Sequence, residues 1–161
     1  TVSGGVRMDV ASTAVELRTV SGDIELHAPS AKTSLQTVSG NVTADGVRRE
    51  VDAESVSGDV NLRVDAARHA RVKTVSGDVT VEALLEGDGR VSVESLSGDL
   101  HVQLPAKTSA ELTAHTFSGE VASEFGGTVS RRGDELKQTI GDGKGRIELQ
   151  TFSGDVRVLK R

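Results

Sequence analysis

A short phrase built around Ser-Gly recurs eight times and constrains the fold more than any other feature. It consists of a hydroxyl residue, an apolar residue and Ser-Gly, followed in most copies by Asp and an aliphatic residue, as in Thr74-Val75-Ser76-Gly77-Asp78-Val79. Its glycines are Gly4, Gly22, Gly40, Gly58, Gly77, Gly98, Gly119 and Gly154. Successive copies lie 18, 18, 18, 19, 21, 21 and 35 residues apart. Such a period is typical of repeat architectures, in which each repeat packs only against its neighbours.

The segments between the phrases alternate between apolar and polar residues. Val60, Leu62 and Val64, for example, alternate with Asn61 and Arg63. A period of two indicates strands with one buried face. The sequence therefore predicts an all-β chain.

Identical corners at a near-constant period favour a single-stranded parallel β-solenoid (β-helix) of about eight coils, because like residues then stack on like. An antiparallel β-meander or sandwich is the alternative. Glycine suits a tight corner that needs positive φ, and an adjacent Asp or Asn binds nearby backbone N–H groups. The predicted structural corners are Gly22, Gly40, Gly58, Gly77, Gly98, Gly119 and Gly154.

The alternation breaks inside the phrase itself. Counting by twos from Val93 places Ser95 and Ser97 inward and Leu96 outward, although the middle residue of the phrase is always apolar. We expect a bend near the hydroxyl residue to turn this apolar side chain back into the core, with a second corner at Ser-Gly-Asp. Each coil would then hold two strands of about five residues.

Residues 1–161 are expected to form a single β-solenoid domain, with an irregular cap region over 120–150. Hydrophobic residues make up 35% of the chain and aromatic residues 2%, which suits a thin aliphatic core. Residues 136–149 are predicted to form a C-terminal hairpin that turns on the glycine run 141–145 and closes the solenoid. The chain opens within a repeat, so we expect it to be part of a longer protein.

The repeated phrase resembles that of a known family, as does the ending Ile140-Gly141-Asp142-Gly143 followed by Leu149-Gln150-Thr151-Phe152-Ser153-Gly154-Asp155-Val156. The resemblance is to the bacterial β-strand-repeat (SGD-repeat) proteins of the cell envelope that are named as adhesins. It covers essentially the whole chain. It implies a β-solenoid-like domain of an exported or membrane-anchored protein, without known catalytic or ligand-binding residues.

Composition argues against several kinds of partner. The net charge is −5, the 19 basic residues are interspersed with 24 acidic ones, and the chain has no Trp or Tyr, which disfavours nucleic acid. No apolar stretch approaches membrane-spanning length. The absence of Cys excludes thiolate chemistry.

The residue after each corner glycine is usually acidic, which raises the question of a metal site. In a solenoid these residues form one column: Asp23, Asn41, Asp59, Asp78, Asp99, Glu120 and Asp155. Carboxylates are calcium ligands, so a calcium column at Asp23, Asp59, Asp78, Asp99 and Asp155 is an alternative. One interrupted carboxylate per coil supplies too few oxygens, however, so we predict a structural corner, with no metal and no cofactor.

No catalytic residues are predicted. The hydroxyl pairs of the phrase, such as Thr74 and Ser76, are expected to form an internal ladder that bonds the backbone of the bend. The histidines His27, His69, His101 and His115 fall in different columns. No Ser is matched with a His and an acid at equivalent repeat positions, so a catalytic triad lacks support.

Two short motifs have other interpretations. Gly141-Asp142-Gly143-Lys144-Gly145 is similar to a phosphate loop, but no Ser or Thr follows Lys144, so a hairpin turn is favoured. Arg132-Gly133-Asp134 spells an integrin-recognition tripeptide, which also arises by chance.

The sequence as a whole predicts a non-enzymatic structural or interaction module of a bacterial cell-envelope or extracellular protein. Adhesion or end-to-end self-association through the solenoid ends is the expected activity, with a protein or a second copy as the partner. The alternatives are an envelope-stress sensing domain that binds a peptide or cell-wall ligand, and a carbohydrate-binding or carbohydrate-active β-helix. A localised site is expected where the repeat breaks, at residues 86–90, at 126–145 or in the first coil.

Overall fold

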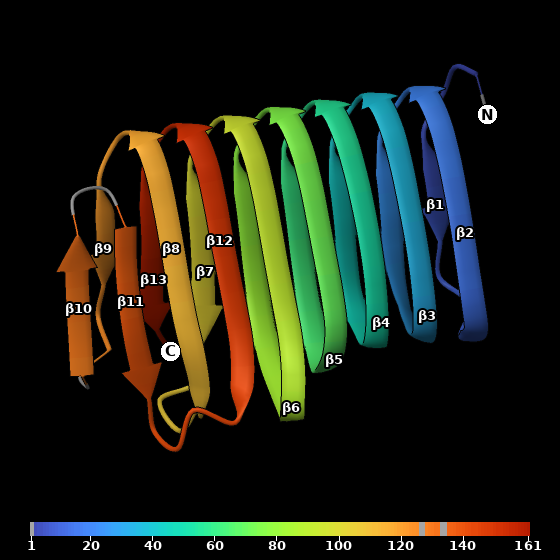
Figure 1. Cartoon of the computed structure of the whole chain (residues 1–161). Coiled ribbons are helices and arrows are strands. Elements are labelled where there is room, and N and C mark those ends of the chain that lie inside the picture. The colour runs from blue at the N-terminus through green and yellow to red at the C-terminus, as the bar shows by residue number, and fades with distance from the viewer. Residues whose placement is uncertain (1, 126–127, 133–134) are drawn as a thin grey trace.

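The computed structural model describes residues 2–125, 128–132 and 135–161, and these form a long, mostly parallel β-sheet wound into a rod (Figure 1). The predicted all-β class is confirmed. The strands are β1 (Val6–Met8), β2 (Ser12–Ser21), β3 (Ile24–Ser39), β4 (Val42–Ser57), β5 (Val60–Ser76), β6 (Val79–Ser97), β7 (Leu100–Leu104), β8 (Ala110–Ser118), β9 (Val121–Ser123), β10 (Thr128–Arg132), β11 (Glu135–Ile140), β12 (Gly145–Ser153) and β13 (Val156–Lys160).

Neighbouring coils pair in parallel, with equivalent repeat positions in register. Ile24 pairs with Val42, and Leu35 pairs with Ala53, each 18 residues further along the chain. Among the described residues, antiparallel pairing is confined to β10 with β11 and β11 with β8. The parallel β-solenoid prediction fits this arrangement, whereas the antiparallel meander does not.

The strands β3 to β6 are long because each runs down one side of the rod, around a corner and up the other side (Figure 1). The register shifts lie at this lower corner, for example between His27 and Lys32 and between Val64 and His69. The predicted bend near the hydroxyl residue is therefore wrong, because alternation continues unbroken up to Ser-Gly. The upper corner is the Ser-Gly-Asp phrase, where Gly58 has a φ of 128°.

The order of coils along the rod differs from their order in the sequence. Strand β12 lies between β6 and β8, and β13 lies between β7 and β9 (Figure 1). The predicted hairpin over 136–149 is thus wrong, because β8 separates β11 from β12. The turn at 141–145 instead carries the chain past β8. The hairpin beyond β8 at this end of the sheet is formed by β10 and β11.

The core is a thin aliphatic layer between the two sides of the rod. Large and small side chains alternate along part of its columns, as in Leu26, Ala44 and Leu62, all of which are buried. Such alternation lets successive layers fill the interior without large aromatic residues.

Candidate interaction surface

The upper corner of the rod presents one outward apolar side chain from every Ser-Gly phrase, and we call this row the apolar ridge. Its exposed fractions range from 44% at Val75 to 75% at Val2. In the order of the coils, its members are Val2, Val20, Val38, Val56, Val75, Leu96, Phe152 and Phe117. The prediction that these residues turn into the core is wrong, because strand alternation places the preceding hydroxyl residue inward instead.

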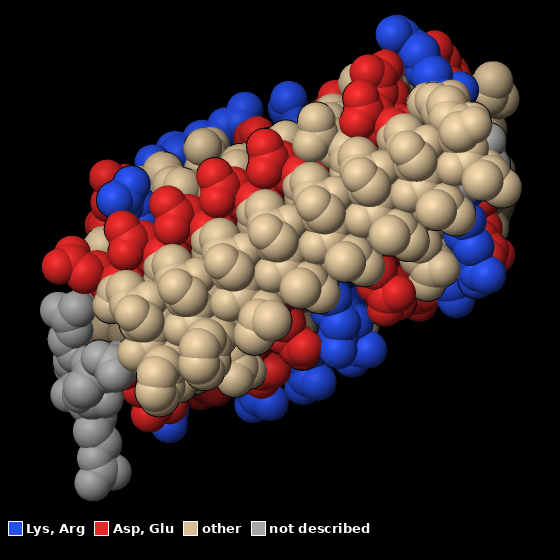
Figure 2. All heavy atoms as spheres, turned by 90° about the horizontal axis from the view of Figure 1, so that it is seen from above, with Lys and Arg blue, Asp and Glu red and all other residues tan. Residues whose placement is uncertain are grey.

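Figure 2 shows the corner from above as a continuous belt of uncharged side chains along the rod. The aromatic rings of Phe152 and Phe117 stack within this belt, with centroids 4.8 Å apart and planes 7° from parallel. That separation matches the spacing of neighbouring strands in a sheet, about 4.8 Å. The ridge residues therefore follow one another at the repeat of the sheet itself.

A long open groove of about 1110 Å³ runs beside the ridge. One wall is the ridge, and the other is a polar ladder of side chains two positions earlier in each strand. In coil order, this polar ladder is Arg18, Gln36, Glu54, Lys73, Glu94, Gln150 and His115. The groove thus combines an apolar wall with a wall that can form hydrogen bonds and ion pairs.

The inward hydroxyl residues Thr19, Thr37, Ser55, Thr74, Ser95 and Thr151 also line the groove. The hydroxyl pair of the phrase is split, since Thr74 is buried whereas Ser76 is exposed. Bonding to the corner backbone is seen at Thr116, whose Oγ1 donates to the Gly154 carbonyl oxygen at 3.0 Å, and at Thr151. Thr19, Thr37, Ser55, Thr74 and Ser95 have no such partner among the described residues.

The acidic column lies on the side of the ridge opposite the groove, and it is visible as a red row beside the belt in Figure 2. Each side-chain Oδ1 from Asp23 to Asp155 accepts a hydrogen bond from the backbone N–H of the equivalent residue in the next coil, at 2.7–3.0 Å. Asn41 occupies the same position and accepts the same bond from Asp59. No cluster of three or more His, Asp or Glu side chains with metal-site geometry occurs within the described part of the chain.

Many charged side chains on the two sides of the rod pair between coils. Examples are Lys73 with Glu94 at 3.0 Å, and Lys32 with Glu50 at 3.4 Å. His27 Nδ1 lies 3.0 Å from an Asp45 carboxylate oxygen. Exposed pairs of this kind contribute little stability each, about 0–1 kcal/mol. They match like positions of adjacent coils and do not converge on one point.

The regions where the repeat breaks contain no comparable surface among the described residues. Gly141 to Lys144 form a turn in which the Asp142 and Lys144 backbone N–H groups donate to Ser109 Oγ. Residues 86–90 belong to the lower corner within β6. The tripeptide Arg132-Gly133-Asp134 lies in part outside the described residues. Sequence reasoning missed the ridge, although the count from Val93 had placed Leu96 outward.

A family model described as Toastrack DUF4097 matches residues 1–159. No curated protein matches the chain. No solved structure matches it either. The described residues contain no helix with the length and apolar character to cross a membrane.

Proposed function

This chain belongs to the Toastrack DUF4097 family, and we propose that it is a non-enzymatic interaction module that binds a protein partner along its apolar ridge. The apolar ridge carries the proposal. A contiguous row of exposed Val, Leu and Phe side chains that is rimmed by polar residues is typical of a protein-binding surface.

The ridge has no role in the hydrophobic core. Val38 and Val56 are about half exposed, whereas the buried side chains of the same strands, such as Leu35 and Ala53, fill the interior. A polar residue would satisfy the backbone geometry at these positions equally well. Their apolar character in every copy of the phrase therefore supports a function outside the fold.

The contacts of the neighbouring polar groups favour binding over catalysis. Gln36 Nε2 donates to Glu54 at 3.1 Å, Lys73 pairs with Glu94, and the acidic column bonds the corner backbone. A catalytic site requires one exceptional arrangement of groups. The groove instead carries one polar side chain per coil in a regular row, and the pairs among them join equivalent positions of adjacent coils.

The cell envelope is the location that we propose, following the resemblance to bacterial SGD-repeat proteins, and adhesion or assembly is the corresponding role. A sensing domain with a peptide ligand would use the same groove. The carbohydrate alternative has less support, because the ridge has one aromatic pair and six aliphatic residues. End-to-end association at β2 stays a prediction. Among the strands that the structure describes, β2 pairs only with β3.

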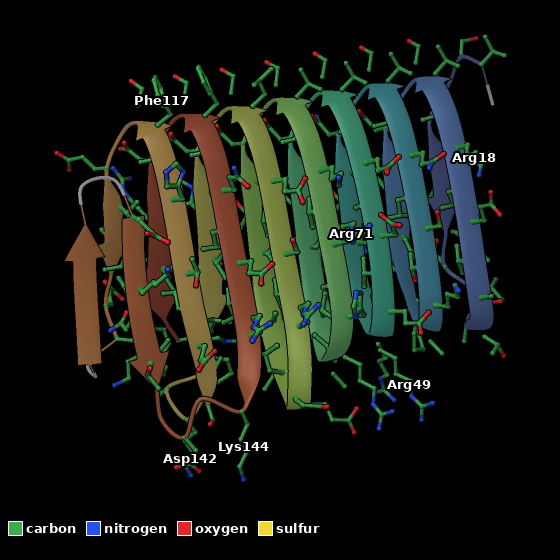
Figure 3. All side chains as sticks on the ribbon, viewed as in Figure 1. Arg18, Arg49, Arg71, Phe117, Asp142 and Lys144 are labelled. Atoms are coloured by element: carbon green, nitrogen blue, oxygen red, sulfur yellow. The ribbon has the colours of Figure 1, made fainter. Side chains whose placement is uncertain are left out.

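Site-specific photo-crosslinking in the cells that make the protein tests this function. A benzophenone side chain at Phe117 or Val56 is expected to give discrete protein adducts. Lys144 is the matched control, because it is exposed on the opposite corner (Figure 3). The adduct at Phe117 should be lost when Val56→Asp and Val75→Asp are introduced. Equal labelling from Phe117 and Lys144 would overturn the proposal.

A further inference from the structure

We propose that the partner on the apolar ridge is a second copy of this chain, and that the two rods lie side by side and parallel. This inference rests on the proposed function, since it names the occupant of the same surface. The two-fold axis would run along the rods, so that each ridge residue faces its own equivalent.

Periodicity is the first argument for a second copy. The eight ridge side chains follow at about 4.8 Å and therefore span roughly 34 Å. An α-helix repeats every 5.4 Å or so, and an extended strand presents one face about every 6.8 Å. Either surface loses register with the ridge over this length. A second ridge keeps register from Val20 to Phe117.

The width of the ridge indicates that its flanks take part as well. A stable interface buries about 800 Å² on each partner. A row one side chain wide and roughly 34 Å long falls short of this area. The rows on either side, which are the acidic column and the polar ladder, must therefore meet the partner too. Their charges then decide the orientation of the second copy.

Charge complementarity favours the parallel arrangement. The acidic column carries six carboxylates, from Asp23, Asp59, Asp78, Asp99, Asp155 and Glu120. The polar ladder is balanced, with Arg18 and Lys73 against Glu54 and Glu94. These rows lie on opposite sides of the belt (Figure 2).

An antiparallel pair with its two-fold axis across the rods would set one acidic column against the other. Like charges placed this way repel. An axis along the rods instead sets each acidic column against the balanced ladder of the other copy. Arg18 then faces Asp23 of the second copy, and Lys73 faces its Asp78. Glu54 and Glu94 meet carboxylates in the same register, but these four ladder residues carry no net charge, so the total repulsion is smaller than between two acidic columns.

Single-cysteine cross-linking tests both the partner and its orientation, because the chain has no native Cys. Val20→Cys and Leu96→Cys are each expected to form a disulfide-linked dimer with their own kind on mild oxidation. Lys144→Cys, on the opposite corner, is the control and should stay monomeric (Figure 3). An antiparallel pair would link Val20→Cys efficiently only when mixed with Phe152→Cys, and that result would overturn the parallel arrangement.

Light scattering on the unmodified chain completes the test. Across a dilution series, the mass should approach twice 16.8 kDa at high concentration. The double variant Val56→Asp, Val75→Asp should stay at 16.8 kDa with an unchanged β-sheet circular dichroism spectrum. A monomer at every concentration would overturn the proposal that the partner is a second copy of this chain. If Phe117 then still cross-links a different protein in cells, the proposed function survives without this inference.

Discussion

At the scale of single residues, the Ser-Gly corner has a stereochemical cause. Gly58 combines a φ of 128° with close contact to the preceding coil, since a Cβ there would lie 2.3 Å from the Gly40 carbonyl oxygen. The same contact, at 2.1–2.4 Å, recurs at Gly22, Gly40, Gly77, Gly98, Gly119 and Gly154. Positive φ alone is tolerated by some other residues, but contact with backbone atoms leaves no room for any side chain. The phrase is therefore repeated because every coil has to turn in the same space.

We expect Gly58→Ala to lower the free energy of unfolding by about 3 kcal/mol, because backbone strain and displacement of the neighbouring coil add together. Gly87→Ala is the matched control. Gly87 also has positive φ, at 61°, but nothing lies within 4 Å of the position that an added methyl group would occupy. Its replacement should cost about 1 kcal/mol from strain alone. Urea denaturation measures both variants, and equal losses would contradict the role of coil contact.

At the scale of the strand, the alternation of side chains distinguishes the ridge from the core. Val56 and Val60 lie on either side of one corner, yet Val56 is 46% exposed and Val60 is fully buried. Val60→Thr should lower the free energy of unfolding by about 1–3 kcal/mol, because it buries a hydroxyl group in an apolar layer. Val56→Thr should change it by less than about 0.5 kcal/mol. Thermal unfolding of the two isosteric variants checks the assignment, and a large loss at Val56 would place the ridge in the core.

Period-two patterns and the repeated corner are sufficient to predict the all-β class, the parallel stacking and the alignment of the acidic column. The strand lengths are not predicted, because two strands of about five residues were expected in each coil, whereas β3 to β6 each run for 16–19 residues. The outward direction of Leu96 is not predicted, because the interpretation assumed that a recurrent apolar residue must be buried. Burial is a one-way rule, since a large part of any folded surface is apolar. The alternation from Val93 through Ser95 places Leu96 outward, as the structure has it. The hydrophobicity of Leu96 was given more weight than this alternation. The candidate site was missed for this reason.

At the scale of the whole molecule, the coil order is the feature that sequence spacing conceals. The step from Gly98 to Gly119 is 21 residues, the same as the step before it, so nothing in the spacing indicates that another coil intervenes. The close packing around Gly145, the first residue of β12, is consistent with the position of β12 between β6 and β8. A Cβ there would lie 3.0 Å from the Gly89 carbonyl oxygen and 3.2 Å from that of Ser109. A residue with a side chain would crowd the entry of β12 between its neighbours.

Engineered disulfides can test directly which of the strands β6, β8 and β12 are neighbours. Glu94 in β6 is the register partner of Gln150 in β12, and Gln150 is the register partner of His115 in β8. Neighbouring strands are about 4.8 Å apart, within the Cα separation of a disulfide, whereas two strand spacings of roughly 9.6 Å exceed the limit near 7 Å. Oxidation of the Glu94→Cys, Gln150→Cys variant should therefore give an intramolecular disulfide.

The control for coil order is the Glu94→Cys, His115→Cys variant, which should keep both thiols free. Mass spectrometry of the monomer fraction distinguishes the two results, and it excludes links between copies. If β8 instead stacked directly on β6, the control pair would oxidise and the first pair would not. In that case Phe117 would come before Phe152 along the ridge, and Phe117 would be the neighbour of Leu96.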